Sequence, residues 1–530
     1  MSLLTSRLSA LNSTANRSLL SGIQRGIEKE SLRVTPKGQL ANTPHPKALG
    51  STLTHPSITT DFSESLLEFI TAPSSSIDEV LSSLDNIHRF TYRHIGDELL
   101  WVNSMPCMLG RDADIPLGQY GSSNIGQMKT IYRRGLGNRY GRLMQTIAGI
   151  HYNWSLPDAC WKVLQQSDND SGSLQDFKTE RYFDLIRNFR RHFWLLLYLF
   201  GAAPAVCRSF VKDRAHRLQP MGEDDHSLHL PHATSLRMGD LGYQSKAQES
   251  LIVCYNNLPR YIENLRGALT TPYPAYEAVG VKGPSGKYQQ LNPHLLQIEN
   301  EFYSTIRPKR VTEGGETALE ALWQRGVEYI EVRCVDLNPY MPVGIDAEQM
   351  RFLDVFLMYC LLEKSPQTDN REYGQILNNQ RKIVERGREP GLSLSRGDGE
   401  TSLQEWASEL FSQLQPIAQA LDTSHGGSAH CEAVSAMEQR LQQPELTPAA
   451  QLLEEVRSND STYFQTAMHH AKQHREFFLD SKLDPAVEEQ FISLAAHSLE
   501  DQKAIEAADT LSFDDFLSAY YQQYQFSLES

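Results

Sequence analysis

The alternation of apolar and polar residues predicts a strand in GIEKESLRV, residues 26–34, and this strand poses a problem. Successive side chains of a strand point to opposite faces, so Glu28 and Glu30 share a face with Leu32 and Val34. Burying an unpaired carboxylate costs on the order of several kcal/mol even after relaxation. We therefore expect a positive group close to Glu28 and Glu30.

Two more segments predict strands with a polar face. AGIHYNWSL, residues 148–156, is the most regular alternation in the chain, and it places His151 on the polar face. GVEYIEVRCVDLNP, residues 326–339, places Glu331 and Arg333 on one face. Both segments therefore present groups that can bind ions or take part in proton transfer.

The segment DFSESLLEF, residues 61–69, is compatible with two structures. As a helix it places Asp61, Glu64 and Glu68 on one face, since they are three and seven residues apart. As a strand, LLEFIT places Glu68 on the same face as its apolar neighbours. The pattern leaves both alternatives open.

Helical spacing and linker-like composition predict the organisation of the rest of the chain. Helices are expected within 76–100 and over 177–203, and a further strand in QIENEFYSTI, residues 297–306. We expect three regions in all: an α+β catalytic region over 1–385 that begins with an N-terminal helix over 1–20, a linker-like loop over 386–402, and a mostly helical C-terminal region over 403–530 that packs on the catalytic part.

Composition narrows the class of partner. The 530 residues include 50 Lys and Arg against 65 Asp and Glu, for a formal net charge of −15, so neither nucleic acid nor an anionic membrane is expected as the main partner. The seven cysteines are scattered singly, which indicates no zinc ribbon or disulfide framework and favours a reducing cytoplasm. The apolar stretch 193–207 is shorter than the roughly 20 residues of a membrane span and is expected to be a buried helix.

The N-terminal residues have two interpretations. Arginines and serines are frequent and no acidic residue precedes Glu28, as in an amphipathic organelle presequence. The alternative, which we favour, is a first helix that packs on the protein through Leu4, Leu8, Leu11 and Leu19.

Several carboxylates and one imidazole on predicted strands are the donor set of a hard divalent cation. Magnesium takes oxygen ligands, and a single histidine among them also suits manganese. A bound metal would supply the charge that lets clustered carboxylates stay ionised. Basic segments at 126–143, 233–243 and 304–310 offer arginine and lysine side chains for phosphate or carboxylate groups.

Two common nucleotide-binding motifs are not indicated by the sequence. GxxxxGK[ST] does not occur, and GLGNRYG, residues 135–141, follows no clear strand, so neither a P-loop nor a Rossmann site is predicted. Acids for a metal and arginines for phosphate together predict metal-assisted phosphoryl transfer on another architecture. This chemistry leaves a kinase, a ligase and a phosphohydrolase open.

Six long segments closely resemble the bacterial glutamate–cysteine ligase family, type 1. They are GIEKESLRV, HPKALGSTLTHPSITTDFSESLLEFIT, QYGSSNIGQMKTIYRRGLGNRYGRLMQTIAGIHYNWSLP, PHATSLRMGDLGY, LQIENEFYSTIRPKR and GVEYIEVRCVDLNP. The resemblance runs from about residue 22 to 362 and continues more weakly to the C-terminus. It implies an α+β fold like that of glutamine synthetase, in which a curved, mainly antiparallel β-sheet forms a funnel surrounded by helices.

The resemblance also implies roles for individual residues. The positions that match the family's magnesium ligands are Glu28, Glu30, Asp61, Glu68, His151 and Glu331. Arg133 and Arg237 match catalytic arginines near the transferred phosphate and the glutamyl carboxyl group, and Arg333 resembles a further catalytic cation of the active site. Those that match the pocket for the cysteine substrate are Tyr132, Leu136, Tyr243 and Tyr303.

The implied activity is ATP-dependent joining of the γ-carboxylate of L-glutamate to the amine of L-cysteine through a γ-glutamyl phosphate, the first step of glutathione biosynthesis. The resemblance implies Mg²⁺, with Mn²⁺ as the alternative, ATP as co-substrate, glutathione as a candidate inhibitor, no nucleic acid or membrane partner, and a cytoplasmic monomer. Three alternatives stay open: a carboxylate–amine ligase with another acceptor, a metal-dependent phosphohydrolase, and a non-catalytic binding or regulatory protein.

Overall fold

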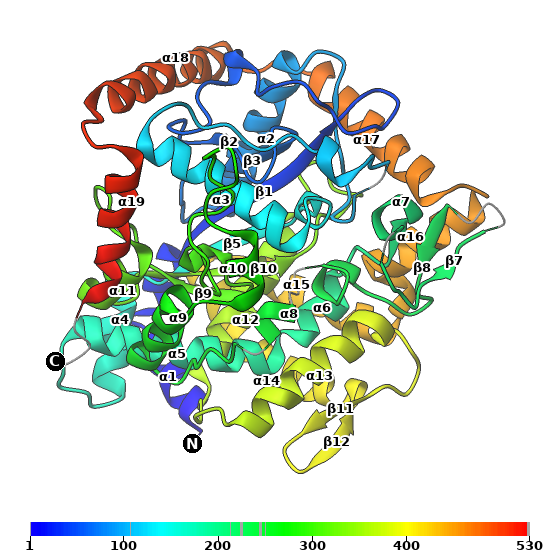
Figure 1. Ribbon diagram of the computed structural model, residues 1–530. Coiled ribbons are helices and arrows are strands. Elements are labelled where there is room, and N and C mark those ends of the chain that lie inside the picture. The colour runs from blue at the N-terminus through cyan, green and yellow to red at the C-terminus, as the bar shows by residue number, and fades with distance from the viewer. Residues whose placement is uncertain are drawn as a thin grey trace.

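A twisted antiparallel sheet lies at the centre of the computed structural model (Figure 1). The structure describes residues 2–106, 108–212, 214–222, 226–242, 246–249 and 251–526. The strands follow the order β2-β3-β1-β5-β10-β9, and β4 pairs with β1 beside this path. They comprise Gln24–Val34 (β1), Ile58–Thr60 (β2), Leu66–Ile70 (β3), Leu99–Leu100 (β4), Ile150–Ser155 (β5), Ile306–Lys309 (β9) and Tyr329–Val335 (β10).

Helices surround this sheet on its outer sides. Those of the first three quarters of the chain are Leu3–Leu11 (α1), Ile77–His94 (α2), Asn124–Tyr140 (α3), Asp158–Ser167 (α4), Leu174–His192 (α5), Trp194–Phe200 (α6), Arg208–Val211 (α7), Lys246–Glu249 (α8), Leu258–Thr270 (α9), Pro274–Val279 (α10), Ala318–Arg325 (α11), Ala347–Leu362 (α12) and Asn370–Arg386 (α13). A small second sheet joins Ala205–Cys207 (β6), Gln219–Pro220 (β7) and Ser227–His229 (β8). The predicted α+β organisation is confirmed.

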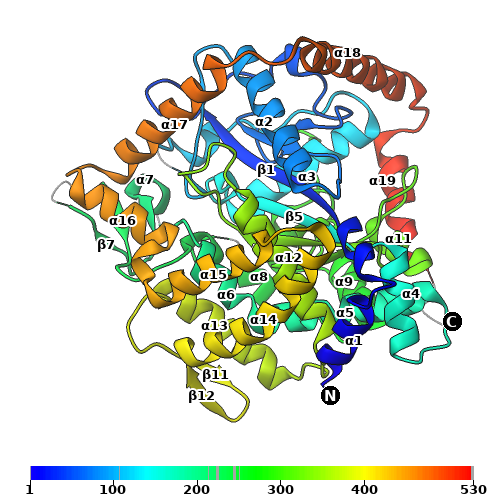
Figure 2. The same ribbon diagram turned by 180° about the vertical axis from the view of Figure 1, so that it is seen from behind.

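Helix α12 packs against the face of the sheet that points away from the carboxylates (Figure 2). Asp354 of this helix is fully buried and ion-pairs with Arg25 at 2.7 Å. The same carboxylate accepts a hydrogen bond from the Tyr152 hydroxyl at 2.9 Å. One helix therefore ties the neighbouring strands β1 and β5 together from behind.

Two local predictions are wrong. Residues 297–306, expected to be a strand, contain a short 3-10 helix at Glu299–Glu301, and the strand begins only at Ile306. The backbone amide of Gln297 donates a hydrogen bond to the Glu301 carboxylate at 2.6 Å. Such a local bond competes with the pairing of a strand. Residues 386–402, expected to be a linker-like loop, contain a hairpin of Ser393–Arg396 (β11) and Gly399–Ser402 (β12).

The hairpin has a simple physical basis. Gly397 in its turn has a φ of +60°, which glycine adopts without steric cost. The Asn379 side chain of α13 bonds both the amide and the carbonyl of Ser395 at 2.8 Å, so the hairpin docks on α13. The glycine content that suggested a linker therefore belongs to a turn.

The C-terminal part of the described chain is helical. It comprises Leu403–His425 (α14), Ala429–Gln442 (α15), Pro448–Ser458 (α16), Tyr463–Asp480 (α17), Pro485–Ala508 (α18) and Phe513–Gln522 (α19). One hydrophobic core extends from Leu4 in α1 to Tyr524 beyond α19. In Figure 1, α18 crosses the top of the molecule and α19 descends beside α3 and α11. The division into catalytic and C-terminal domains stays a prediction.

Three further sequence expectations concern the N-terminus, the cysteines and the membrane. Leu4, Leu8 and Leu11 are buried, so the first residues form a packed helix, but the helix expected over 1–20 ends at Leu11 and a 3-10 helix follows at Arg17–Gly22. Cys207 is disulfide-bonded, a pairing that scattered cysteine spacing does not reveal. Among the described helices, none combines the length and the apolar character needed to cross a membrane.

Candidate active site

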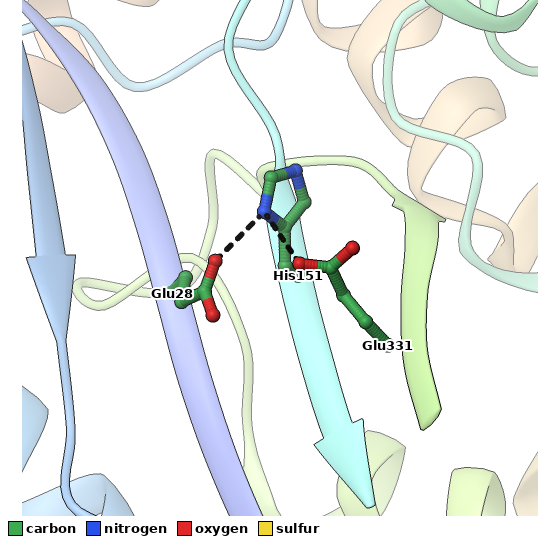
Figure 3. Close-up of side chains that lie close together, drawn as sticks. All are labelled: Glu28, His151 and Glu331. Carbon is green, nitrogen blue, oxygen red and sulfur yellow. Dashed lines mark hydrogen bonds and ion pairs between the residues drawn. The ribbon is translucent and has the colours of Figure 1, made fainter. Parts of the chain in front are cut away.

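Glu28, His151 and Glu331 form a tight cluster on one face of the sheet (Figure 3). One ligand atom from each residue lies within 4.8 Å of the others. His151 Nδ1 is 3.1 Å from Glu28 Oε2 and 4.0 Å from Glu331 Oε1. Glu331 is 1% exposed and His151 is 5% exposed, so these polar groups face an interior surface.

Strand register brings these residues together although they are far apart in the chain. Glu28 lies directly opposite His151 in the β1–β5 pair, and Glu331 lies opposite Asn153 in the β5–β10 pair. Directly opposed residues point to the same face, so three adjacent strands present their polar side chains together. Asn153 Nδ2 also donates to Glu28 Oε1 at 2.9 Å, which fixes that carboxylate.

A second group of carboxylates adjoins the cluster. Glu30 lies opposite Glu68 in the β1–β3 pair, and Glu30 Oε1 is 4.0 Å from His151 Nε2. Burial raises the pKa of Glu68 well above its usual range, and the nearby Asp61, Glu28 and Glu30 carboxylates raise it further. These residues lie together, and Glu68 is on a strand, so the strand alternative for this segment is the right one.

The donor set suits a hard divalent cation. It consists of carboxylate oxygens and one imidazole, the ligands that Mg²⁺ and Mn²⁺ accept. Burial and, after it, the neighbouring like charges raise the pKa of Glu68, and an added cation would neutralise those charges. The residues present therefore fit a metal site.

Three cations surround the Glu331 carboxylate. Arg333 is 3.1 Å, Lys309 3.3 Å and Arg307 3.9 Å from it. Burial alone would raise the pKa of Glu331, but Lys309 and Arg333 outweigh burial and hold the pKa well below its usual range. Positive charge is therefore built into this side of the site.

Arg133 approaches the carboxylates from helix α3. Its guanidinium donates to the Asp61 backbone carbonyl and lies 3.8 Å from the Asp61 carboxylate. The same group lies over the Tyr120 ring, 4.3 Å from its centroid, which is a cation–π contact. Two independent contacts therefore orient Arg133.

Arg237 is more deeply buried than Arg133. Its side chain is fully buried and ion-pairs with Asp336 at 2.7 Å. It also donates to the Arg333 carbonyl at 3.2 and 3.3 Å, and a Cβ on Gly149 would lie 2.8 Å from its Nη1 atom. The structure thus gives Arg237 a rigid position behind Arg333, and its predicted catalytic role stays a prediction.

A cavity of about 620 Å³ opens beside the cluster, and His151, Arg333, Tyr303 and Gln248 are among its lining residues. The Tyr303 hydroxyl accepts a hydrogen bond from Gln145 Nε2 at 2.9 Å. A cavity lined by polar and aromatic side chains is suited to a small polar ligand.

Tyr132 and Leu136, the other described residues predicted for the acceptor pocket, lie on helix α3. Burial raises the pKa of Tyr132 well above its usual range, and nearby Glu301 and Tyr303 raise it further. Tyr132 therefore lies near the Tyr303 side of the site. Tyr243, predicted for the same pocket, lies outside the described residues.

Comparison with known proteins decides the family. A family model described as glutamate-cysteine ligase matches residues 8–383. A glutamate–cysteine ligase of Alcanivorax borkumensis is 53% identical, with 98% of this chain and 99% of that protein covered. One of Saccharophagus degradans is 51% identical, with 97% of each chain covered. The chain belongs to the glutamate–cysteine ligase family.

Solved structures agree with this assignment. A glutamate–cysteine ligase of Francisella tularensis, solved in complex with AMP, has a TM-score of 0.89 at 36% identity and covers 94% of this chain and 98% of its own. A bifunctional glutathione synthetase of Pasteurella multocida shares the fold, with a TM-score of 0.69 at 23% identity over 97% of this chain and 60% of its own. The family resemblance, the fold class and the identification as a ligase are therefore confirmed.

Asn153, which bonds Glu28, was not among the predicted site residues of this glutamate–cysteine ligase. Lys309 and Arg307 were expected only as cations of the basic segment 304–310 for phosphate or carboxylate groups, and the structure places both beside Glu331. Asn153 shares a strand face with His151, and Lys309 and Arg307 alternate along one basic strand. The alternation of side chains between the two faces of β5 and β9 could therefore have predicted all three residues.

Proposed function

We propose that the Glu28–His151–Glu331 cluster is the centre at which this glutamate–cysteine ligase uses ATP to form γ-glutamylcysteine, ADP and phosphate in the first step of glutathione biosynthesis. The observation that supports this assignment is a buried metal-type donor set placed directly beside Lys309, Arg307 and Arg333. Anionic ligands and cationic side chains in one interior site suit a phosphoryl group that carries its own divalent ion.

In this proposal the metal ligands are Glu28, Glu30, Asp61, Glu68, His151 and Glu331, and Mg²⁺ is the expected ion with Mn²⁺ as the alternative. When bound, the divalent ion would neutralise charge on the transferred phosphoryl group. The Asn153 amide and the Gly149 backbone amide, which bond the carboxylates of Glu28 and Glu30, hold these ligands in place.

The chain's own cations align the reacting groups. Arg133, Arg237 and Arg333 are the proposed catalytic arginines, because guanidinium groups bind phosphate and carboxylate oxygens in a two-pronged geometry. A γ-carboxylate oxygen of glutamate attacks the terminal phosphorus of ATP, and ADP leaves. The cysteine amine then attacks the carbonyl carbon of the acyl phosphate, phosphate leaves, and the amine loses a proton. Alignment and preorganised charge supply much of the rate.

The acceptor pocket is proposed to consist of Tyr132, Leu136, Tyr243 and Tyr303, because aromatic edges contact sulfur favourably. L-glutamate, L-cysteine and ATP are the proposed partners, and glutathione is a proposed inhibitor. We further propose that the protein acts as a monomer in the cytoplasm; these last points rest on the family resemblance.

The deciding experiment measures ADP release with glutamate, ATP, Mg²⁺ and a panel of amino acids. Cysteine is expected to stimulate release strongly, and Glu331→Gln is expected to abolish it. Glu328→Gln, an exposed neighbour in the same segment, is the matched control and should retain activity. Stimulation by another amine alone would indicate a different acceptor, and phosphate release without any amine would indicate a phosphohydrolase.

A further inference from the structure

The C-terminal helices hold α3 from the outside of the molecule (Figure 1). The backbone amide of Asn124, the first residue of α3, donates to the Asp509 carboxylate, and the Ser122 amide donates to Glu506 Oε1 at 2.8 Å. Carboxylates at a helix N-terminus pair with unsatisfied amides and with the positive end of the helix dipole. The end of α18 and the residue after it therefore fix where α3 begins.

Gln297 connects α19 to the middle of α3. Its side chain is fully buried, Nε2 donates to the Tyr132 carbonyl at 3.2 Å, and Oε1 accepts from the Leu291 amide at 3.0 Å. The Gln297 carbonyl accepts a hydrogen bond from the Tyr521 hydroxyl at 2.9 Å. The same hydroxyl accepts from Asn292 Nδ2 at 2.7 Å, so Tyr521 holds both ends of the 292–297 turn.

Helix α3 is shaped to receive this glutamine. A Cβ on Gly135 would lie 2.0 Å from Gln297 Oε1, so the absence of a side chain makes room for the amide. Tyr132 also packs against a small hydrophobic cluster that α3 shares with α19, made of Met128, Ile131, Leu291 and Leu517. Hydrogen bonds and apolar packing therefore act on the same turn of α3.

We propose that Gln297 and Tyr521 are positioning residues for the acceptor pocket. They touch no substrate; they set the position of the α3 turn that carries Tyr132 and Leu136, and this inference rests on the proposed function of those two residues. Arg133 on the same turn has separate contacts with Asp61 and Tyr120. Loss of the Tyr521 hydroxyl therefore weakens acceptor binding more than phosphoryl transfer.

The test is steady-state kinetics of the full-length chain with Tyr521→Phe. The KM for cysteine should rise about three- to tenfold, the range expected for one lost hydrogen bond, while kcat and the KM for ATP stay within about twofold. Tyr524→Phe is the matched control, since the Tyr524 hydroxyl bonds Glu299 and Tyr520 rather than Gln297. It should leave the KM for cysteine unchanged even if the melting temperature falls.

A second pair of variants approaches Gln297 from the other side. Gly135→Ala must displace the Gln297 amide and should raise the KM for cysteine in the same way, whereas Gly267→Ala, inside α9, meets no atom within 4 Å and should not. Equal KM values for cysteine in Tyr521→Phe and Tyr524→Phe, or an equal rise in the KM for ATP, would overturn this inference alone. A wild-type chain that shows no cysteine-dependent ADP release would overturn the proposed function and this inference with it.

Discussion

Glu331 and Glu68 belong to the same carboxylate group but have opposite surroundings. Glu331 lies among Lys309, Arg307 and Arg333, and these cations lower its pKa against the effect of burial. Burial raises the pKa of Glu68, and other carboxylates raise it further. The protein thus neutralises the Glu331 side of the site with its own side chains, and the Glu68 side is where the proposed metal ion would add positive charge.

Glu68→Gln should therefore not destabilise the metal-free protein. Burial and the neighbouring carboxylates disfavour the charged form of Glu68, and glutamine cannot take that charge, so the melting temperature in EDTA is expected to equal that of wild type or to exceed it by about 1–2 °C. Thermal unfolding followed by circular dichroism measures this. Glu64→Gln is the control, because the Glu64 carboxylate accepts amide hydrogen bonds from His45 and Gln119 at 2.7 Å and its loss should lower the melting temperature. A lower melting temperature for Glu68→Gln would count against the repulsion.

Strand periodicity made the metal-type residues predictable. Glu28, His151 and Glu331 each lie on a predicted strand, and the alternation of side chains shows from the sequence alone which residues of that strand share their face. The ion pair of Arg237 with Asp336 could not be predicted, because it joins segments 99 positions apart. For Glu68 the local pattern allowed helix or strand, and only pairing with β1 and β2 decides.

At the scale of elements, helix α12 packs behind strands β1 and β5, which carry Glu28 and His151. Asp354 lies between Arg25 of β1 and Tyr152 of β5, with no exposed surface. Long, regular elements such as α2 were predictable from spacing, whereas the β11–β12 hairpin was not, because it depends on docking to Asn379. The turn found where a strand was expected at 297–306 was likewise not predictable, because a local hydrogen bond from the Gln297 backbone amide to the Glu301 carboxylate favours it.

Asp354→Ala should destabilise the protein strongly. Arg25 would remain buried without its partner, which costs about 3–5 kcal/mol. Denaturant unfolding at neutral pH measures the loss. Asp158→Ala, which removes a surface pair with Lys178 from a carboxylate that is 67% exposed, should change stability by less than about 1 kcal/mol. A similar small loss in both variants would mean that α12 does not support the strands through this pair.

At the scale of the whole molecule, several histidines are neutral in the interior. His192 lies between Tyr359 and Trp406 at ring distances of 5.6 and 5.8 Å, and burial lowers its pKa to about 3, with a further contribution from Arg191. Burial also lowers the pKa of His474 to about 3. The unfolded chain binds these protons more readily, so the folded state is penalised in acid.

Stability should therefore fall as the pH decreases from about 6.5 toward 3, by up to about 1.4 kcal/mol per pH unit for each such histidine. Above pH 6.5 this contribution is complete and constant. His192→Phe is expected to flatten the slope of unfolding free energy between pH 6.5 and 4, as measured by urea titrations. The exposed His497→Gln is the control and should leave the slope unchanged. Parallel slopes for wild type and His192→Phe would contradict the assignment.

Magnesium should stabilise the folded protein as well as support activity. A ligand that binds only the native state at 100 times its Kd adds about 2.7 kcal/mol. The melting temperature is therefore expected to rise with added Mg²⁺ and to return after EDTA. In Glu331→Gln this increment should be largely lost. An increment of the same size in wild type and Glu331→Gln would show that magnesium binds elsewhere.

The order in which the strands occur in the chain has a consequence for biosynthesis. The cluster needs β1, β5 and β10, whose contributing residues are Glu28, His151 and Glu331. A nascent polypeptide on the ribosome cannot assemble this site until more than half of its length has emerged. Fragments from interrupted translation that stop before β10 would therefore lack the proposed metal site and the ATP-dependent activity proposed for it.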